Sequence, residues 1–597
     1  MQVHSFHIPV MGTGFTIDTP LKVGRYGISS VMSVDDNLME KMREHYSAVY
    51  GQTYVPIPKD APDSRARRIT EYIDLVGGIV SRQVKEVRCS AFEPGSEITK
   101  YHELLPEDSP IKEEYLRMLS THDPEEKVQL QGSLRRKVTA GSIGVNILTK
   151  LDRPNYREGQ PLEREQSDAM SALRGFAKSR YGDTIVLSAG VNPHLFSYFE
   201  EFGDFYADAD GAAKKKIILK VSDFRSAFTQ GRIFAKKGIW VWEYRIESGL
   251  NCGGHAFATV GHLMGMVLEE FKQKRAEFTA QLSEIYRKAV QDRGVPVLAS
   301  ALRCRVTAQG GIGTGNEDRF LRRYYELDGT GWGTPFLLVP EATSVDDVTL
   351  ERLVQATGED VRLTKLSPMG VPIYSLRTSV SEEVRLRRIR EGRPGSPCMN
   401  GYMAFNTEFT AVPICTASYA YQKRKIDELK KSGLSEEEYS REYDKIVDKA
   451  CVCHDLGDSA LLKSGLRYAN VELAPAICPG PNIAYYSRIF SLKEMVDHIY
   501  SRANVLDPSV RRPHVLVNEL GLYINHLIEF VAEKCHQATQ KELSHFDEFK
   551  QNLLDGIQYY RGLADAIREE SVAAREVFVA DLRALQSKLE TVVLPVV

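Results

Sequence analysis

The sequence has no long apolar run and almost no net charge. None of its 597 residues belongs to an apolar stretch that approaches the roughly 20 residues of a membrane-spanning helix. The first residues, MQVHSFHIPV, lack the charged and apolar regions of a secretory signal. The net charge of −3 implies no general attraction to nucleic acid or to an anionic membrane. We therefore expect a cytoplasmic protein with no nucleic-acid and no membrane partner.

The sequence also lacks the features of a disulfide framework. It contains nine cysteines, an odd number, in a long chain that begins without a signal. Such usage is typical of a reducing compartment, where cysteines bind metal or pack in the core. Internal repeats and low-complexity tracts are absent as well, so a solenoid or a long disordered region is not expected.

What the chain does contain is a regular alternation of short apolar strands and helical stretches. Strands alternating with helices indicate a parallel sheet, and eight such units indicate a closed barrel rather than an open sheet. The predicted fold is therefore α/β, a (β/α)8 TIM barrel over residues 1–365. The expected strands are 6–11, 28–34, 142–148, 184–191, 217–222, 239–245, the stretch from 305 and the stretch ending at 331.

Three segments depart from this rhythm. Residues 36–134 are charged and helical in period, which predicts a helical insertion, either a lid or a subunit contact in a homo-oligomer. Residues 366–490 are rich in Pro, Gly and Cys, so an irregular extension is expected there, with one charged helical hairpin at 423–449. Residues 491–597 have helical apolar spacing and predict a helical C-terminal region.

Two glycine-rich turns follow the last two predicted strands. Gly310 and Gly311 end the first, and Gly333 and Thr334 end the second. Glycine lets backbone N–H groups approach an anion closely, and a helix that begins behind the turn adds its positive end. Since these loops form the common phosphate site of (β/α)8 barrels, we predict that they hold a cofactor phosphate. The alternative is a pair of ordinary turns.

One histidine follows a predicted barrel strand directly. Gly253, Gly254 and His255 lie just beyond the strand at 239–245, where the active sites of barrels are built. The two glycines allow tight packing against a flat ligand, and an imidazole can take or give a proton near neutral pH. The alternative is a hydrogen-bonded structural histidine.

Five of these pieces together resemble a known family. They are I-P-V-M-G-T-G-F, I-G-V-N-I, C-G-G-H-A, T-A-Q-G-G-I and G-W-G-T-P-F-L-L-V-P-E-A, in this order. They resemble the FMN-dependent barrels of the nitronate monooxygenase (2-nitropropane dioxygenase) family, which includes FabK-type enoyl reductases and the enoyl reductase component (PfaD type) of polyunsaturated fatty acid synthases. The acidic residue of the family's GGH motif is Asn251 here, followed by Cys252, so the substrate does not transfer.

The resemblance implies an FMN-dependent oxidoreductase. It places Met11, Gly12 and Thr13 behind the flavin ring, Asn146 and the Gly253–Gly254 pair against it, and the phosphate at Gly310, Gly311, Gly333 and Thr334. It makes His255 the proton-transfer residue. FMN would carry the redox step on an activated carbon acid or an enoyl-type substrate, small or linked to an acyl carrier. No separate dinucleotide-binding unit is evident in the sequence. NAD(P)H, if used, would therefore have to enter the flavin pocket directly.

Lys220 ends a predicted strand and admits two interpretations. It could place positive charge near a reduced flavin, or it could be a solvated lysine at a strand end. Grouped carboxylates such as Asp35 and Asp36 are better explained as solvated helix surfaces than as catalytic pairs.

Five cysteines fall in the irregular extension: Cys398, Cys415, Cys451, Cys453 and Cys478. Pro- and Gly-rich loops commonly hold cysteines around a metal, and a Cys followed by Pro resembles the last ligand of ferredoxin clusters. Their spacing matches no standard pattern, and buried free cysteines are the competing interpretation. An Fe–S cluster, ahead of zinc, is the metal hypothesis. A cluster beside a flavin would favour a reductase.

The large helical additions motivate a second function of another class. In this alternative the barrel has lost catalysis and serves as a binding or scaffold subunit of a larger synthase. The two functions differ in whether His255 matters for turnover.

Overall fold

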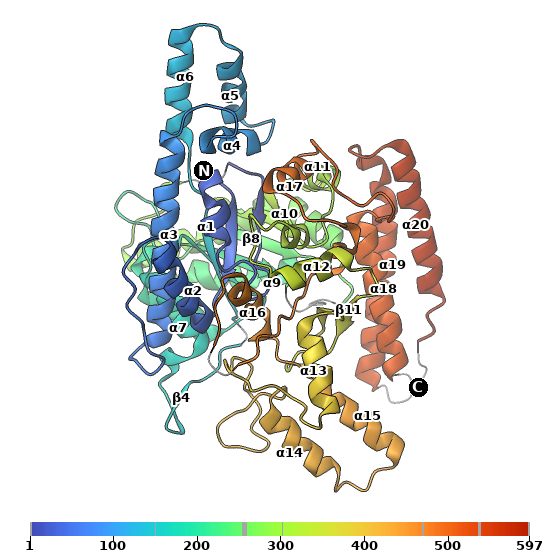
Figure 1. Ribbon diagram of the computed structural model, residues 1–597. Helices are drawn as coiled ribbons and strands as arrows, with labels where there is room; N and C mark the ends of the chain where they lie inside the picture. Colours follow the sequence, from blue (N-terminus) through green and yellow to red (C-terminus); the bar gives the residue numbers. More distant parts are fainter. Residues whose placement is uncertain are drawn as a thin grey trace.

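Eight parallel strands close into a barrel at the centre of the molecule (Figure 1). The computed structural model describes residues 3–149, 151–253, 260–300, 302–468, 471–534 and 539–594. Around the barrel the strand order is β1-β10-β9-β8-β7-β6-β3-β2, so each strand pairs with its neighbours in the chain and β10 closes onto β1. This confirms the predicted (β/α)8 barrel. The strands are β1 Phe6–Ile8, β2 Ser29–Ser33, β3 Ile143–Ile147, β6 Thr184–Leu187, β7 Lys216–Val221, β8 Val241–Glu247, β9 Arg305–Gln309 and β10 Gly329–Gly331.

A ring of helices covers the outside of the barrel. Neighbouring members pack against each other, as α3 does against α1 and α7, and α9 against α10. The helix between β2 and β3 is therefore α3, which belongs to the segment predicted as an insertion. The helices of the ring are α1 Thr19–Val23, α3 Ser64–Cys89, α7 Asp168–Lys178, α8 Pro193–Tyr198, α9 Phe224–Lys236, α10 Met264–Arg293, α11 Gly315–Tyr324 and α12 Asp347–Gln355.

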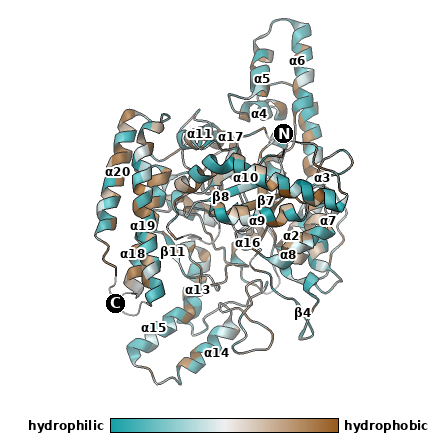
Figure 2. Cartoon of the chain, turned by 180° about the vertical axis from the view of Figure 1, so that it is seen from behind, coloured by the Kyte–Doolittle hydropathy of each residue, from teal (hydrophilic) through white to brown (hydrophobic). Residues whose placement is uncertain are grey.

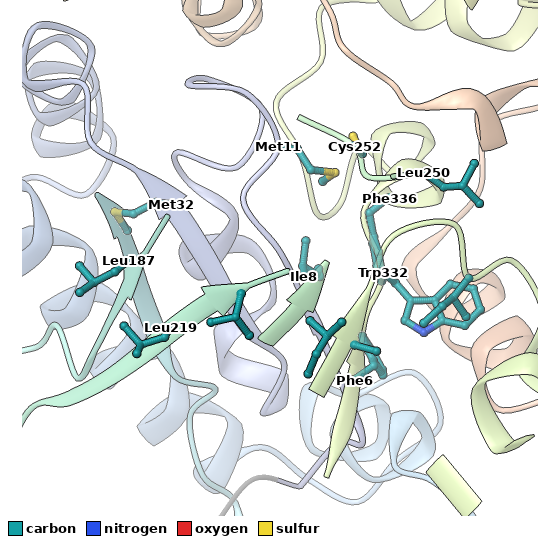
Figure 3. Close-up of a cluster of buried hydrophobic side chains, with 14 of the residues drawn as sticks. Phe6, Ile8, Met11, Met32, Leu187, Leu219, Leu250, Cys252, Trp332 and Phe336 are labelled. Carbon is teal, nitrogen blue, oxygen red and sulfur yellow. The ribbon is translucent and has the colours of Figure 1, made fainter. Parts of the chain in front are cut away.

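Side chains alternate in direction along each strand. One set faces outward to the helices, and the other set faces the inside of the barrel. Outward-facing apolar side chains such as Phe6, Met32, Leu187 and Leu219 are buried between barrel and helices (Figure 3). Inward-facing positions carry few apolar residues. Val31, Val186 and Ile218, from β2, β6 and β7, form a small cluster with Val10, which follows β1.

The remaining inward positions described for β8 and β9 are polar. On β8 these positions are Glu243, Arg245 and Glu247, and on β9 they include Thr307 and Gln309. Arg245 Nη2 lies 2.6 Å from Glu243 Oε1, and Thr307 donates a hydrogen bond to the same oxygen. Although burial opposes it, Arg245 lowers the pKa of Glu243 to about 2, so the carboxylate stays charged. The barrel is thus held by a buried ion pair as well as by packing.

Additions extend the barrel at its two ends (Figure 1). α4 Glu97–Leu104, α5 Pro110–Ser120 and α6 Pro124–Lys137 stand at the end where the strands begin, because their neighbours Tyr26 and Thr139 precede β2 and β3. α2 Asp36–Val49 packs on α3. The segment 36–134 is helical as predicted.

The extension 366–490 lies at the opposite end, where the strands finish. It contains α13 Val380–Arg390, the hairpin α14 Tyr419–Leu429 and α15 Glu436–Val447, and α16 Asp455–Lys463. A two-stranded sheet of β11 Val361–Thr364 and β12 Ile373–Leu376 begins it, and a small hairpin of β4 Tyr156–Arg157 and β5 Gln160–Pro161 comes from the barrel loop after β3. From behind, α14 and α15 are largely hydrophilic (Figure 2). α14 and α15 pack against each other, which confirms the predicted helical hairpin.

The C-terminal region is helical as expected. α17 Leu492–Ile499 packs on α11, and α18 Val515–Lys534, α19 Gln540–Leu563 and α20 Val572–Glu590 pack against one another beside α10. One window of α18, Val515–Ala532, is long and apolar enough to cross a membrane by length and composition alone, contrary to the expectation that no such run exists. Half of this window is buried inside the protein.

Glu519 anchors α18 to the barrel. This fully buried carboxyl accepts a hydrogen bond of 2.8 Å from the Met264 N–H at the start of α10. Burial raises its pKa from the ordinary value of 4.5 to about 7. Because the folded pKa is the higher one, the folded state binds the proton more tightly. Its stabilising effect is complete below pH 4.5 and disappears as the pH rises through about 7.

We therefore expect the substitution Glu519→Gln to remove a pH dependence of stability. Between pH 5 and pH 8 the native chain should lose about 2–3 kcal/mol of unfolding free energy that the variant keeps. Urea denaturation at both pH values measures the difference. Glu529→Gln, an exposed position on the same helix, is the control and should leave the pH dependence unchanged. Parallel pH profiles for Glu519→Gln and the native chain would contradict the assignment.

Candidate functional site

A cavity of about 520 Å³ lies where the barrel strands end. Its floor consists of inward-facing residues at the ends of five strands, and its opposite wall comes from the extension 366–490. The volume falls within the range of small-molecule and cofactor sites. The floor residues are Ser33, Asn146, Ser188, Lys220 and Glu247. The part of the extension that covers the strand ends, residues 366–456, is here called the roof. Its residues that line the cavity are Met369, Val371, Ile373, Tyr402, Met403, Val452, Cys453 and Leu456.

The turn after β1 forms one side of the cavity. Gly12 and Thr13 line it, and Met11 is buried beside them. Gly253 packs directly on this turn, because a Cβ at position 253 would lie 2.6 Å from the Gly12 nitrogen. The turn is also fixed from the roof side, where the Gly14 N–H donates a 3.0 Å hydrogen bond to the Leu456 carbonyl. Residues predicted to surround a flavin ring therefore meet at one place.

Asn146 presents an acceptor to the cavity. It occupies the inward position near the end of β3 and is 2% exposed. Its Oδ1 atom is buried and has no hydrogen-bond partner among the described residues, and the same holds for the Thr13 hydroxyl oxygen. Leaving a buried polar atom unpaired costs about 1–3 kcal/mol, so such atoms commonly mark the place of a ligand.

Lys220 belongs to a buried polar network. Its side chain is only 12% exposed, and Nζ lies 3.2 Å from Glu247 Oε1. The same oxygen accepts hydrogen bonds from Asn251 Nδ2 at 2.5 Å and from Gln309 Nε2 at 2.8 Å. The interpretation of a solvated lysine is therefore wrong, because an inward position at the end of β7 places the ammonium against the carboxylate of β8. Lys220 provides a fixed positive charge on the cavity floor.

The network continues into the barrel through Gln309. Its Oε1 lies 3.4 Å from His7 Nε2 on β1. Burial and the neighbouring Arg245 lower the pKa of His7 to about 3, so this imidazole is neutral at physiological pH. Glu247 and Gln309 were not expected from the sequence. The E-Y-R-I-E alternation of β8 carries the signal, since it puts polar residues on one face of a strand in a barrel.

The two glycine turns of the predicted phosphate site follow β9 and β10 as expected, but neither lines the cavity. Segment 478–482, here called the covering segment, packs over them. Thr334 Oγ1 donates a 2.7 Å hydrogen bond to the Pro479 carbonyl, and Asn482 Nδ2 donates one of 2.7 Å to the Gly311 carbonyl. The start of α11 is likewise occupied, since Glu317 Oε2 accepts the Gly313 N–H at 2.9 Å. Polar groups of the protein itself therefore already contact the two turns that were predicted to bind a phosphate.

Two predicted site residues, Gly254 and His255, lie outside the described residues. Gly253, which precedes them, lines the cavity. Its neighbour Cys252 is 5% exposed, and its thiol donates a 3.2 Å hydrogen bond to the Cys478 carbonyl. Burial raises the pKa of Cys252 well above its usual value, so the thiol remains protonated, as expected of a core residue.

The cysteines of the extension divide into two places. Cys398, Cys415, Cys451 and Cys453 gather in the roof, since Cys398 packs beside Cys415 and lines one small cavity with Cys451. Cys478 belongs to the covering segment, and its carbonyl accepts the Cys252 thiol. A hydrogen bond from the Cys415 thiol lowers the pKa of Cys398 to about 7. A hydrogen bond that the Cys453 thiol donates to Cys451, together with burial, raises the pKa of Cys453.

A buried polar clamp fixes the roof to the barrel. The Tyr402 hydroxyl donates to Asp35 Oδ1 at 2.9 Å or to Asp36 Oδ1 at 3.0 Å, and Asn400 Nδ2 donates to Asp35 Oδ2 at 3.0 Å. Arg65 pairs with Asp36. Asp35 and Asp36 are 2% and 6% exposed, so their interpretation as a solvated helix surface is wrong. Burial raises the pKa of Asp35, whereas for Asp36, despite burial, Arg65 and Arg68 lower it.

A flat heterocycle with polar edges fits the cavity. Apolar side chains of Val10, Ile147, Val452 and Leu456 line its walls, and the unpaired oxygens of Asn146 and Thr13, with the charge of Lys220, lie at its floor and side. These residues fit the ring end of a flavin. The phosphate end of a flavin does not fit at the two glycine turns after β9 and β10, because the covering segment packs over them.

Comparisons with solved structures return chains of low sequence identity and low TM-score. No family model matches the chain, and no curated protein matches it. FabK from Thermotoga maritima is 16% identical over 64% of this chain and 82% of its own, with a TM-score of 0.30. The enoyl reductase domain of MlnA, from the macrolactin biosynthesis cluster of Bacillus amyloliquefaciens, is 14% identical over 68% and 89%, with a TM-score of 0.33. Nitroalkane oxidase from Streptomyces ansochromogenes is 11% identical over 62% and 77%, with a TM-score of 0.29.

Proposed function

We propose that this chain is a flavin-dependent oxidoreductase whose cavity holds the ring end of FMN. One observation supports this above the others. Asn146, with its unpaired buried oxygen, shares a single cavity with Gly12 and Thr13 of the turn after β1 and with Lys220 at the end of β7. The sequence motifs assign Asn146 and this turn to a flavin, and a positive charge from Lys220 near a reduced flavin was one of its two interpretations.

A bound flavin would supply hydride transfer, and the residues of this chain would position it and the substrate. Asn146 Oδ1, buried and without a partner among the described residues, would accept a hydrogen bond from the ring. The ammonium of Lys220, held by Glu247, favours negative charge at the nearby edge of the ring. The roof covers the cavity on the side opposite the floor. His255 moves the proton at the substrate carbon, in an activated carbon acid or an enoyl-type compound that is free or linked to an acyl carrier.

We expect the purified protein to bind about one FMN per chain, with the absorbance bands of a flavoprotein. Asn146→Leu should weaken binding about ten-fold, because the variant loses the hydrogen bond to the ring. Gln273→Leu, on the exposed side of α10, is the control and should leave binding unchanged. Titration of the apoprotein followed by flavin fluorescence measures both. A protein that takes up no FMN would falsify the proposal.

The same purified protein also distinguishes between the two proposed functions, an enzyme and a scaffold subunit. His255→Ala should retain FMN and lose turnover if the chain is an enzyme. An unchanged activity in this variant would favour a scaffold role within a synthase.

A further inference from the structure

Four cysteine thiols meet in the roof although they come from three separated stretches of chain. Cys398 packs against the small buried cluster that contains Cys415, Cys398 and Cys451 line one small cavity, and Cys453 follows Cys451 by two residues. None of the four forms a disulfide, and three are buried while Cys398 is half-buried. A cluster of four reduced thiols is the ligand set of structural zinc and of iron–sulfur centres.

The backbone holds these loops in place. Ser396 and Ser418 form a parallel bridge, so the two loops that carry Cys398 and Cys415 run side by side. The Ser396 N–H also donates a 3.0 Å hydrogen bond to the Ala417 carbonyl.

A histidine closes the cluster on the side of α16. His454 Nδ1 lies 3.4 Å from Asp455 Oδ1 and 3.3 Å from Asp458 Oδ1, which fixes the ring. Its other nitrogen, Nε2, is buried without a partner among the described residues. His454 and the thiols of Cys398 and Cys451 line one small cavity of about 10 Å³.

The spacing of the sulfurs distinguishes between the two kinds of centre. Ligands bound to one zinc ion at about 2.3 Å cannot be more than about 4.6 Å apart. Among the described residues, only His454, Asp455 and Asp458 bring three ligand atoms within 4.8 Å of one another. The four sulfurs are therefore spread too widely for one zinc ion. Cys398 packs beside Cys415, and Cys453 follows Cys451 by two residues, so the four cysteines form two pairs. A two-iron cluster takes one pair of cysteines on each iron.

We propose that Cys398, Cys415, Cys451 and Cys453 hold a two-iron iron–sulfur cluster in the wall of the cavity. Cys453 and Met403 line that cavity, opposite Asn146 and Lys220. The cluster would therefore lie beside the place assigned to the flavin ring. This position rests on the proposed function, whereas the cluster itself does not, because its ligands are complete without a flavin.

The test is metal and sulfide analysis of the full chain purified without oxygen. We expect about two irons and about two acid-labile sulfides per chain, together with a reduced-cluster signal in electron paramagnetic resonance after dithionite. About one zinc without sulfide would overturn the iron–sulfur assignment. The absence of both metals, also after incubation with ferrous iron and sulfide, would overturn the site.

Two variants locate the cluster. Cys415→Ser should lose more than nine-tenths of the iron, whereas Cys304→Ser, a buried cysteine outside the roof, should keep it. Equal loss in both variants would contradict the location. FMN binding is measured on the same samples, so a native chain that holds iron without FMN refutes the flavin proposal alone, and one that holds FMN without iron refutes the cluster alone. If Cys415→Ser does not fold, the analysis of the native chain still decides.

Discussion

Replacing Arg512 by methionine should lower the free energy of unfolding by about 3–5 kcal/mol, because it leaves a buried carboxylate without its partner. Arg512 Nη1 lies 2.7 Å from Glu317 Oε1, and the two side chains are 5% and 2% exposed. Arg512 also donates a 2.6 Å hydrogen bond to the Gly311 carbonyl. One side chain thus joins the C-terminal region to the turn after β9 and to the start of α11.

The cost is large because Glu317 cannot move to water. Its oxygens already accept hydrogen bonds from the N–H groups of Gly313 and Val515, at 2.9 Å and 2.6 Å. Urea denaturation measures the effect. In the double variant Arg512→Met with Glu317→Gln the charge is gone, so part of the stability should return. Arg323→Met breaks an exposed pair with Glu569 and should cost no more than about 1 kcal/mol. A similar small cost at Arg512 would contradict the account.

The second large effect is expected at Gly253, where alanine should weaken FMN binding more than ten-fold. Gly253 has a φ of +71°, and an added Cβ would lie 2.6 Å from the Gly12 nitrogen and 2.9 Å from the Met11 Cα. Both are backbone atoms of the turn that backs the proposed ring site, so they cannot yield as a flexible side chain would. The collision should push the turns after β1 and β8 apart and widen the cavity.

A matched glycine separates the collision from backbone strain. Gly294 has a φ of +64° with nothing within 4 Å of its added Cβ. Gly294→Ala therefore carries only the strain of a left-handed conformation, about 1 kcal/mol, and should bind FMN normally. Titration of both variants with FMN gives the comparison. Equal affinities in the two variants would show that the contact between Gly253 and Gly12 does not shape the site.

The barrel was predictable because its signals are local. Period-two strands, glycine turns and helical spacing each occupy a few neighbouring residues, and they identified the eight strands that close the sheet. The floor of the cavity follows from the same pattern, since Asn146 and Lys220 end strands on the inward face. In a closed barrel, inward-facing residues at the strand ends surround one cavity, so Asn146 and Lys220 lie on the same floor.

The roof was not predictable, because its contacts join distant parts of the chain. Asp35 and Asp36 have the composition of a solvated helix start, yet Tyr402, more than three hundred residues later, buries them. In the same way, Gly311 and Thr334 are typical of a phosphate turn, and only the fold shows that segment 478–482 covers them. The four clustered cysteines have no standard spacing, so their meeting depends on how the loops cross.

The position of the roof in the chain sets an order of assembly. Every barrel strand is complete by Gly331, but the roof residues that line the cavity extend to Leu456. A ribosome adds about 5–20 residues per second, so the strand ends stay uncovered for some seconds of synthesis. A cofactor can enter the open mouth during this interval, before Tyr402 and α16 close over it. Loading during translation and loading of the finished chain are therefore different events, with different barriers.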